Sequence, residues 1–203
     1  MKRLILIDSH AIIYRAYHAL PPMTGLNGEP THAVYGFTTI LLRIIRELKP
    51  DYIAAAFDLS GPTFRHIASE RYKATRPETP DDLASQFVKV KDILAAFGIP
   101  VFEKEGYEAD DVLGTIVEKV SKEKNLETII VTGDMDALQL VGPNVKVYAM
   151  RKGVSDMVIY DVDGVKERYG FAPEQMVDFK ALKGDASDNI AGVKGIGEKT
   201  ALV

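Results

Sequence analysis

Three acidic residues crowd into four positions near the middle of the sequence. They are Glu108, Asp110 and Asp111, and the apolar pair Val112 and Leu113 follows them directly. One interpretation is structural, because the free N–H groups and positive dipole of a helix N-terminus stabilise acids in the first turn. The other is chemical: the carboxylates form one wall of a metal site, where a cation offsets their repulsion.

Further acids directly follow three short apolar segments that have the composition of strands buried on both faces. These segments end at residues 7, 57 and 133, and the acids after them are Asp8, Asp58 and Asp134, with Asp136 close behind. In an open parallel sheet, ligands bind beyond the carboxyl ends of the strands. The sequence therefore predicts that three strands direct these acids to one edge of the sheet.

A last acidic pair, Asp185 and Asp188, has the same spacing as Glu108 and Asp111, which share a helix face. The set of candidate metal ligands is therefore Asp8, Asp58, Glu108, Asp110, Asp111, Asp134, Asp136, Asp185 and Asp188. The chain carries a net charge of −4, so removing these nine negative charges would leave it at +5. Any one of these acids could simply cap a helix or form a turn, but their conjunction favours a metal site.

No histidine or cysteine accompanies these acids at a metal-ligand spacing, since the chain has no cysteine and its histidines are at 10, 18, 32 and 66. Sites made only of oxygen suit Mg²⁺ or Mn²⁺ rather than zinc. Such clusters are typical of two-metal phosphoryl-transfer sites. We therefore expect two Mg²⁺ ions, with Mn²⁺ as a substitute.

A basic segment from about residue 61 to residue 80 interrupts the pattern of strands and helices. Residues 65–76 hold four Lys or Arg side chains and one Glu. Lys73 and Arg76 are three positions apart, and the ring of Tyr72 could stack on a base. A basic segment over an acidic metal site suits a phosphodiester substrate. The structural alternative is a solvated surface face.

A glycine-rich turn near the C-terminus is a second candidate for phosphate binding. Its residues are Gly192, Lys194, Gly195, Gly197, Lys199 and Thr200. Glycines in a turn that leads into a helix expose backbone N–H groups able to hold a phosphate.

The rest of the pattern indicates an α/β fold with a mostly parallel central sheet flanked by helices. We expect strands at 4–7, 52–57 and 128–132, a hairpin of 145–150 with 157–160, and helices at 31–48, 81–97, 109–123, 136–140 and 173–183. Thr79 is the expected N-cap of the second of these helices, and Asp161 is expected to cap another helix.

Length and composition limit the possible classes of protein. A chain of 203 residues with 46% hydrophobic residues suits one globular domain, or one domain with an appendage. The absence of cysteine fits a reducing compartment, so we expect a cytoplasmic location. The apolar runs are too short to cross a bilayer, so we expect no membrane partner.

Taken in order, the motifs resemble the 5′-nuclease domain of the bacterial DNA polymerase I family, which is related to flap endonucleases and more distantly to PIN-like nucleases. The resemblance covers essentially the whole chain. It is carried by Leu-Ile-Asp-Ser-His (6–10), Gly-Glu-Pro-Thr-His-Ala-Val-Tyr-Gly-Phe (28–37), Ala-Phe-Asp (56–58), Thr-Phe-Arg-His (63–66), Tyr-Lys-Ala-Thr-Arg-Pro-Glu-Thr-Pro (72–80), Glu-Ala-Asp-Asp (108–111), Thr-Gly-Asp-Met-Asp (132–136) and Gly-Asp-Ala-Ser-Asp-Asn-Ile (184–190).

The resemblance implies a PIN-like 5′-nuclease fold with a helical arch at about 61–80 and a C-terminal helix–hairpin–helix motif. It implies a catalytic domain over 1–170 and the start of the helix–hairpin–helix region over 171–203. The implied activity is that of a Mg²⁺-dependent 5′-3′ exonuclease and flap endonuclease of DNA replication and repair. Such an enzyme cuts DNA near the junction of duplex and 5′ single strand, leaving a 5′ phosphate and a 3′ hydroxyl.

The resemblance also implies roles for individual residues. The nine acids hold metal ions directly or through water. Lys73 and Arg76 match a basic catalytic pair that contacts the scissile phosphate, and Arg65 and Tyr72 help to place the substrate. The duplex backbone and a monovalent cation would be held by the turn of Gly192, Lys194, Gly195, Gly197, Lys199 and Thr200.

One departure concerns the C-terminus. The chain stops at Val203, within the second helix of the expected motif, whereas the family's domain continues well beyond it. We expect a competent metal site, weaker DNA binding, reduced stability, and a fused C-terminal polymerase that is absent from this chain. The expected oligomeric state is a monomer.

Two other classes of function remain open. A phosphatase or Toprim-like phosphotransfer domain would explain Asp134 and Asp136 as an acidic pair after a strand, but it would not explain the basic segment. The first strand also lacks the acidic pair of haloacid-dehalogenase-type phosphatases. A metal-stabilised DNA-binding module is the non-enzymatic alternative, and it would bind flap DNA without cutting it.

Overall fold

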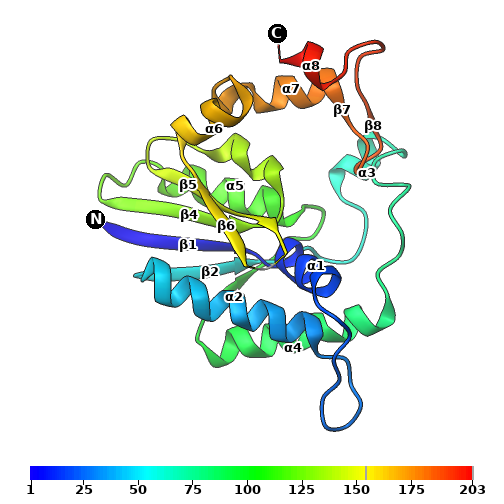
Figure 1. Ribbon diagram of the computed structural model, residues 1–203, viewed down its shortest axis with the longest axis vertical. Helices are drawn as coiled ribbons and strands as arrows, with labels where there is room; N and C mark the ends of the chain where they lie inside the picture. Colours follow the sequence, from blue (N-terminus) through cyan, green and yellow to red (C-terminus); the bar gives the residue numbers. More distant parts are fainter. Residues whose placement is uncertain (154, 203) are drawn as a thin grey trace.

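The computed structural model describes residues 1–153 and 155–202. Its centre is a six-stranded sheet of order β3-β2-β1-β4-β5-β6, in which every neighbouring pair is parallel except β5 with β6 (Figure 1). The predicted mostly parallel α/β sheet is confirmed. The strands are β1 (Lys2–Asp8), β2 (Tyr52–Ala56), β3 (Val101–Phe102), β4 (Leu126–Thr132), β5 (Val145–Lys152) and β6 (Asp156–Tyr160), and a separate antiparallel hairpin consists of β7 (Gly184–Asp185) and β8 (Ile190–Ala191).

Helices cover both faces of the sheet (Figure 1). The α-helices are α1 (Ser9–Ala19), α2 (His32–Leu48), α3 (Phe64–Ala68), α4 (Asp81–Ala96), α5 (Ala109–Val120), α6 (Val162–Tyr169), α7 (Met176–Lys183) and α8 (Glu198–Ala201), and the 3-10 helices are η1 (Met135–Leu140) and η2 (Pro173–Gln175). In the described part of the chain, no helix is both long and apolar enough to cross a bilayer.

The alternation of side chains along β1 divides the core into two layers. Ile5 and Ile7 pack with α1, α2 and α4, whereas Leu6 packs on the opposite face with α5, η1, α6 and α7. All three of these side chains are fully buried. A strand covered on both faces needs a continuous apolar run, which is the pattern of residues 4–7.

The helix directly after β1 was not predicted. Asp8 is the N-cap of α1, and its Oδ1 accepts a hydrogen bond from the N–H of Ala11 at 3.1 Å. The helix contains two isoleucines and two tyrosines. These residues have weak helix propensity, so the sequence gives no clear signal for a helix here. Asp8 therefore stabilises the turn from strand to helix in addition to any chemical role.

Other boundaries differ from the predictions in detail. The N-cap of α4 is Pro80 and not Thr79, because the Thr79 hydroxyl pairs with the hydroxyl of Tyr14 at 2.6 Å instead. The predicted helix over 173–183 is divided into η2 and α7. Asp161 caps α6 as predicted, by accepting a hydrogen bond from the N–H of Gly164 at 2.9 Å.

The basic segment 61–80, hereafter the arch segment, runs beside the β7–β8 hairpin (Figure 1). It contains the five-residue helix α3, followed by turns. The N–H of Lys73 donates to the carbonyl of Asp188 at 2.9 Å, and the Asn189 side chain donates to the carbonyl of Arg71 at 2.8 Å. Lys73 and Asn189 both have left-handed backbone conformations, with φ of 53° and 56°, so an unusual backbone is present on each side of this contact.

Candidate active site

Four carboxylates lie at the carboxyl edge of the parallel sheet, and we refer to them as the edge carboxylates. Asp8 ends β1, Asp58 follows β2 and Asp134 follows β4, and these three strands are neighbours in the sheet, as the sequence predicts. Asp110 joins them from the first turn of α5. Asp58 fixes this helix end, because its Oδ1 accepts a hydrogen bond from the N–H of Ala109 at 2.6 Å.

Thr132 connects two of the edge carboxylates, and sequence reasoning missed it. Its hydroxyl donates to Oδ2 of Asp8 at 2.6 Å and accepts from the N–H of Asp134 at 2.9 Å. The side chain is fully buried at the end of β4. A hydroxyl that ends an apolar strand two residues before an acid is the only sequence signal for this role.

The edge carboxylates disfavour one another's charge. Burial raises the pKa of Asp110 to about 8, and the neighbouring carboxylates of Asp8, Asp134 and Asp58 add to this effect. Burial likewise raises the pKa of Asp8 to about 6, against the hydrogen bonds from Thr132 and Ala11. A bound cation would remove this penalty, and a donor set made only of carboxylate oxygens fits Mg²⁺ or Mn²⁺. The residues therefore fit the predicted metal.

The other two acids at the start of α5 contact the arch segment. The Asp111 carboxylate accepts two hydrogen bonds from Arg65, from Nη1 to Oδ2 at 2.6 Å and from Nη2 to Oδ1 at 2.8 Å. Glu108 accepts from Lys73 Nζ and from the Tyr72 hydroxyl, each at 2.9 Å. The N–H of Glu108 also donates to Asp111 at 2.9 Å, so the structural interpretation of the acidic triplet applies, while its part in a metal site stays a prediction.

A second group of acids lies beyond the edge carboxylates and is held by a lysine. Nζ of Lys180, on α7, lies 2.6 Å from Oδ1 of Asp136 and 2.7 Å from Oδ2 of Asp185. Burial favours the neutral form of Asp185, but hydrogen bonds from Lys180 and Ser187 outweigh it and lower the pKa of Asp185 to about 2. Lys180 was not among the predicted residues, since only the fold brings α7 to η1.

The last acid, Asp188, contacts the arch segment from the β7–β8 hairpin. Its Oδ1 lies 2.5 Å from Nη2 of Arg76. Both members of the predicted basic pair, Lys73 and Arg76, are therefore engaged with acids of the same chain.

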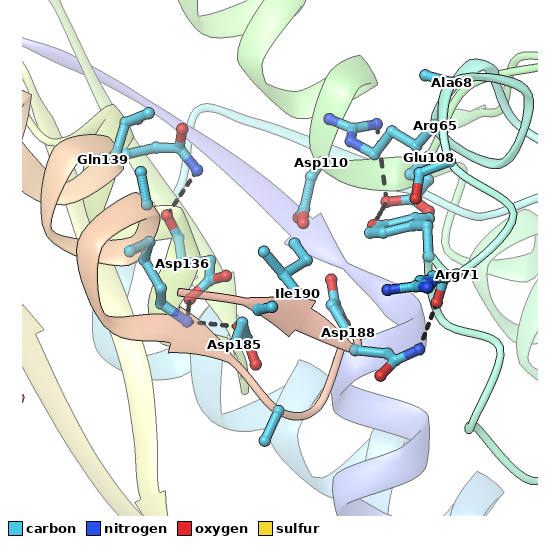
Figure 2. A pocket seen from close by; sticks show the side chains of 18 of the residues that line it. Arg65, Ala68, Arg71, Glu108, Asp110, Asp136, Gln139, Asp185, Asp188 and Ile190 are labelled. Carbon is cyan, nitrogen blue, oxygen red and sulfur yellow. Dashed lines mark hydrogen bonds and ion pairs between the residues drawn. The ribbon is translucent and has the colours of Figure 1, made fainter. Parts of the chain in front are cut away.

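A cavity of about 830 Å³ lies between the arch segment, the hairpin and α7. Figure 2 shows Asp110 between two walls, with Asp136 and Asp185 on one side and Arg65 and Glu108 on the other. Within residues 1–153 and 155–202, no three His, Cys, Asp or Glu side chains already converge closely enough to hold one ion. Five of the nine acids line this cavity, namely Glu108, Asp110, Asp136, Asp185 and Asp188, and all of these except Asp110 pair with a Lys or Arg.

The glycine-rich turn lies at the far end of the hairpin. Gly192 approaches Gly184 so closely that an added Cβ would lie 2.5 Å from the Gly184 nitrogen. Gly195 has φ of +88°, a conformation that favours glycine. Lys194, Lys199 and Thr200 are exposed. Gly192 therefore allows close backbone packing and Gly195 a left-handed turn, and the contact of this segment with DNA stays a prediction.

Comparison with known families adds independent information. The family model named 5′-3′ exonuclease, N-terminal resolvase-like domain, matches residues 3–170. The model of the 5′-3′ exonuclease C-terminal SAM fold matches residues 171–203.

Curated relatives and solved structures agree with these matches. DNA polymerase I of Caldicellulosiruptor bescii is 48% identical, over 98% of this chain and 24% of that protein. DNA polymerase I of Bacillus caldotenax is 46% identical, over 99% of this chain and 23% of that protein. The chain thus spans about a quarter of the length of these relatives.

The fold is similar to that of the bacteriophage T5 flap endonuclease, solved as a pseudo-enzyme–product complex with DNA and metal ions. The TM-score is 0.78 at 21% identity, over 99% of this chain and 73% of that one. Together the two family models match residues 3–203. The chain belongs to the 5′-3′ exonuclease family.

Proposed function

We propose that the chain is a Mg²⁺-dependent, structure-specific 5′ nuclease that hydrolyses DNA phosphodiesters at 5′ ends or 5′-flap junctions. The observation that carries this proposal is a cavity in which Asp110, one of the four edge carboxylates, lies opposite Arg65 and Arg71 of the arch segment (Figure 2). Negative groups at the sheet edge suit metal ions, and positive groups opposite them suit a phosphate.

In this proposal the edge carboxylates Asp8, Asp58, Asp110 and Asp134 hold one metal ion. Glu108, Asp111, Asp136, Asp185 and Asp188 contribute to the same ion or to a second one, directly or through water. When bound, the ions supply an activated water and stabilise the attacking and leaving oxygens.

The cations of the arch segment act on the substrate. Lys73 and Arg76 exchange their present partners, Glu108 and Asp188, for the scissile phosphate. A guanidinium or ammonium that faces a phosphate in a water-poor cavity stabilises the charge that develops there. Arg65 and Tyr72 border the same cavity and orient the strand that enters it.

The DNA partner is proposed from several sources. The T5 flap endonuclease carries DNA and metal ions in its complex. The relatives of this chain are DNA polymerases I that are about four times its length. We therefore infer a 5′ junction of DNA as substrate, duplex binding by the turn of residues 192–200, and a fused polymerase as the natural neighbour. A monomeric state and a cytoplasmic location remain predictions.

The test compares three substrates: an end-labelled 5′-flap duplex, a blunt duplex, and a small phosphate ester. We expect cutting at the flap junction with Mg²⁺ or Mn²⁺ and none with EDTA. Hydrolysis of the phosphate ester alone would favour a phosphatase instead. Metal-dependent binding of the flap without cutting would favour a DNA-binding module.

A further inference from the structure

Lys180 lies where a cation is needed, between two acids from distant parts of the chain. Its Nζ is 2.6 Å from Oδ1 of Asp136 and 2.7 Å from Oδ2 of Asp185. All three side chains line the 830 Å³ cavity, and Figure 2 shows Asp136 and Asp185 side by side on one wall. About a third of the Lys180 side chain is exposed, and Lys180 lines the cavity.

The surroundings fix this arrangement. Gly184 ends α7 with φ of +81°, which turns the chain back so that Asp185 reaches Lys180 five positions earlier. The N–H and hydroxyl of Ser187 bind Oδ1 of Asp185 at 2.8 and 2.6 Å, which leaves Oδ2 directed at the ammonium. The acids are therefore preassembled around Lys180.

The edge carboxylates lack such a partner. Among the described residues, no Lys or Arg forms an ion pair with Asp8, Asp58, Asp110 or Asp134; the one basic contact is His10, 3.7 Å from Asp58. The two halves of the site thus differ: one has uncompensated carboxylates, and the other already contains a positive charge.

We propose that Lys180 is an internal counter-cation that holds Asp136 and Asp185 in the metal-free protein and competes with a divalent ion for their oxygens. This inference rests on the proposed function, since it concerns the second metal of the same site. An ion that binds these oxygens must displace the ammonium or bind beside it, and both alternatives cost Coulomb energy. Lys180 therefore makes the second ion bind weakly while keeping its ligands in place.

Lys180→Met tests this, because methionine keeps much of the length of the side chain and removes its charge. Lys183→Met is the matched control, one turn later on α7, where the lysine pairs with Glu198 at 3.0 Å. Lys180→Arg retains the charge. Each protein is titrated with Mn²⁺ by isothermal calorimetry, without DNA.

We expect wild type to bind one Mn²⁺ ion tightly and a second weakly. In Lys180→Met the second Kd should fall by about tenfold or more, the size expected when a repelling charge a few ångströms away is removed from a partly screened site. Lys183→Met and Lys180→Arg should match wild type. An unchanged second Kd in Lys180→Met would overturn the inference.

Thermal unfolding gives a second readout. With EDTA, Lys180→Met should unfold at a lower temperature than wild type, because Asp136 and Asp185 then repel each other. Mn²⁺ should raise its unfolding temperature more than that of wild type. If Lys180→Met is unfolded in Mn²⁺, or is as unstable in Mn²⁺ as in EDTA, Lys180 has only a structural role and the inference fails.

Neither readout uses DNA, so the inference and the proposed function can fail separately. The calorimetric result expected above, combined with no cutting of flap DNA by wild type, would reject the nuclease and retain the counter-cation. Flap cutting by wild type with identical isotherms for wild type and Lys180→Met would reject only the counter-cation.

Discussion

One buried hydroxyl determines how two metal-binding candidates lie. Thr132 contacts Asp8 through its proton and the backbone N–H of Asp134 through its oxygen. Removal of a group that hydrogen-bonds a ligating carboxylate typically lowers metal affinity by about 10-fold to 100-fold. The role of Thr132 is therefore testable without changing any acid.

Thr132→Val keeps the shape of the side chain and removes both hydrogen bonds. We expect a loss of about 10-fold to 100-fold in divalent-ion affinity. The free energy of unfolding of the metal-free protein should fall by about 1–3 kcal/mol, because a buried donor and acceptor lose their partners. Calorimetric titration and urea unfolding measure the two effects. Thr132→Ser, which retains the hydroxyl, is the control, and equal losses in both variants would contradict the account.

Lys73 tests the substrate side of the site. Lys73→Ala should slow flap cleavage by about 100-fold, the size expected for one lost group that stabilises transition-state charge. The free energy of unfolding should change by only about 1–2 kcal/mol, because Glu108 keeps its contact with Tyr72. Single-turnover kinetics provide the measurement. Lys89→Ala, which removes a surface lysine paired with Glu29 at 3.6 Å, should cleave like wild type.

At the scale of residues, acids that follow strands could be predicted and their partners could not. The end of a strand fixes the position of the residue that ends or follows it, so the placement of Asp8 and Asp134 at the sheet edge follows from the sequence pattern. The pairing of Asp185 with Lys180 depends on the turn at Gly184 and on the packing of α7 against η1, which no local pattern encodes.

At the scale of elements, the packing of α1 against α2 depends on one glycine. A Cβ added to Gly36 would lie 2.6 Å from Cβ of Ala16 and 2.9 Å from Cδ1 of Leu20. The two helices form one wall of the core beneath the sheet, and α1 begins at Asp8. Their close approach therefore helps to fix the strand end that carries a candidate metal ligand.

Gly36→Ala should lower the free energy of unfolding by about 1–3 kcal/mol through overpacking, despite the better helix propensity of alanine. Gly114→Ala in α5 is the matched control, since its added Cβ would meet only Leu140 at an ordinary 3.6 Å. That variant should be neutral or more stable by up to about 1 kcal/mol. Urea unfolding of both proteins decides the matter, and equal effects would show that the α1–α2 contact is not tight.

Elements with a strong period were predicted, and elements set by their neighbours were not. The helices α2, α4 and α5 have clear apolar faces in the sequence, and their extents agree closely with the prediction. The two-residue strand β3 and the five-residue helix α3 are too short to leave a period. The arch segment takes its form from contacts with the hairpin, which only the folded chain supplies.

At the scale of the whole molecule, an ion-pair cluster joins three strands of the sheet. Glu127 on β4 contacts Arg3 on β1 at 2.8 Å and Lys146 on β5 at 2.9 Å. Burial favours the neutral acid, but the hydrogen bonds from Lys146 and Arg3 outweigh it and hold the pKa of Glu127 below its usual 4.5. Because the folded pKa is depressed, this contribution to stability is present above about pH 4.5 and is lost as the pH falls through the folded value.

Glu127→Gln should therefore be less stable than wild type by about 1–2 kcal/mol at pH 7. The difference should shrink toward zero as the pH falls below the lowered pKa of Glu127, where the wild-type carboxyl is also neutral. Thermal unfolding across this range measures the effect, with Glu123→Gln at an exposed site as the control. A difference that stays constant with pH would contradict the assignment.

The central claim is that the carboxyl edge of the sheet holds catalytic metal. It is tested most directly by the single-turnover rate of 5′-flap cleavage in Asp134→Asn at saturating Mg²⁺. Asp134 is exposed, so the protein should fold normally with asparagine at this position. Asp92→Asn, on the surface of α4, is the control. We predict a loss of about a thousandfold in Asp134→Asn, equivalent to about 4 kcal/mol, and none in the control. Cleavage by Asp134→Asn at the wild-type rate would contradict the account.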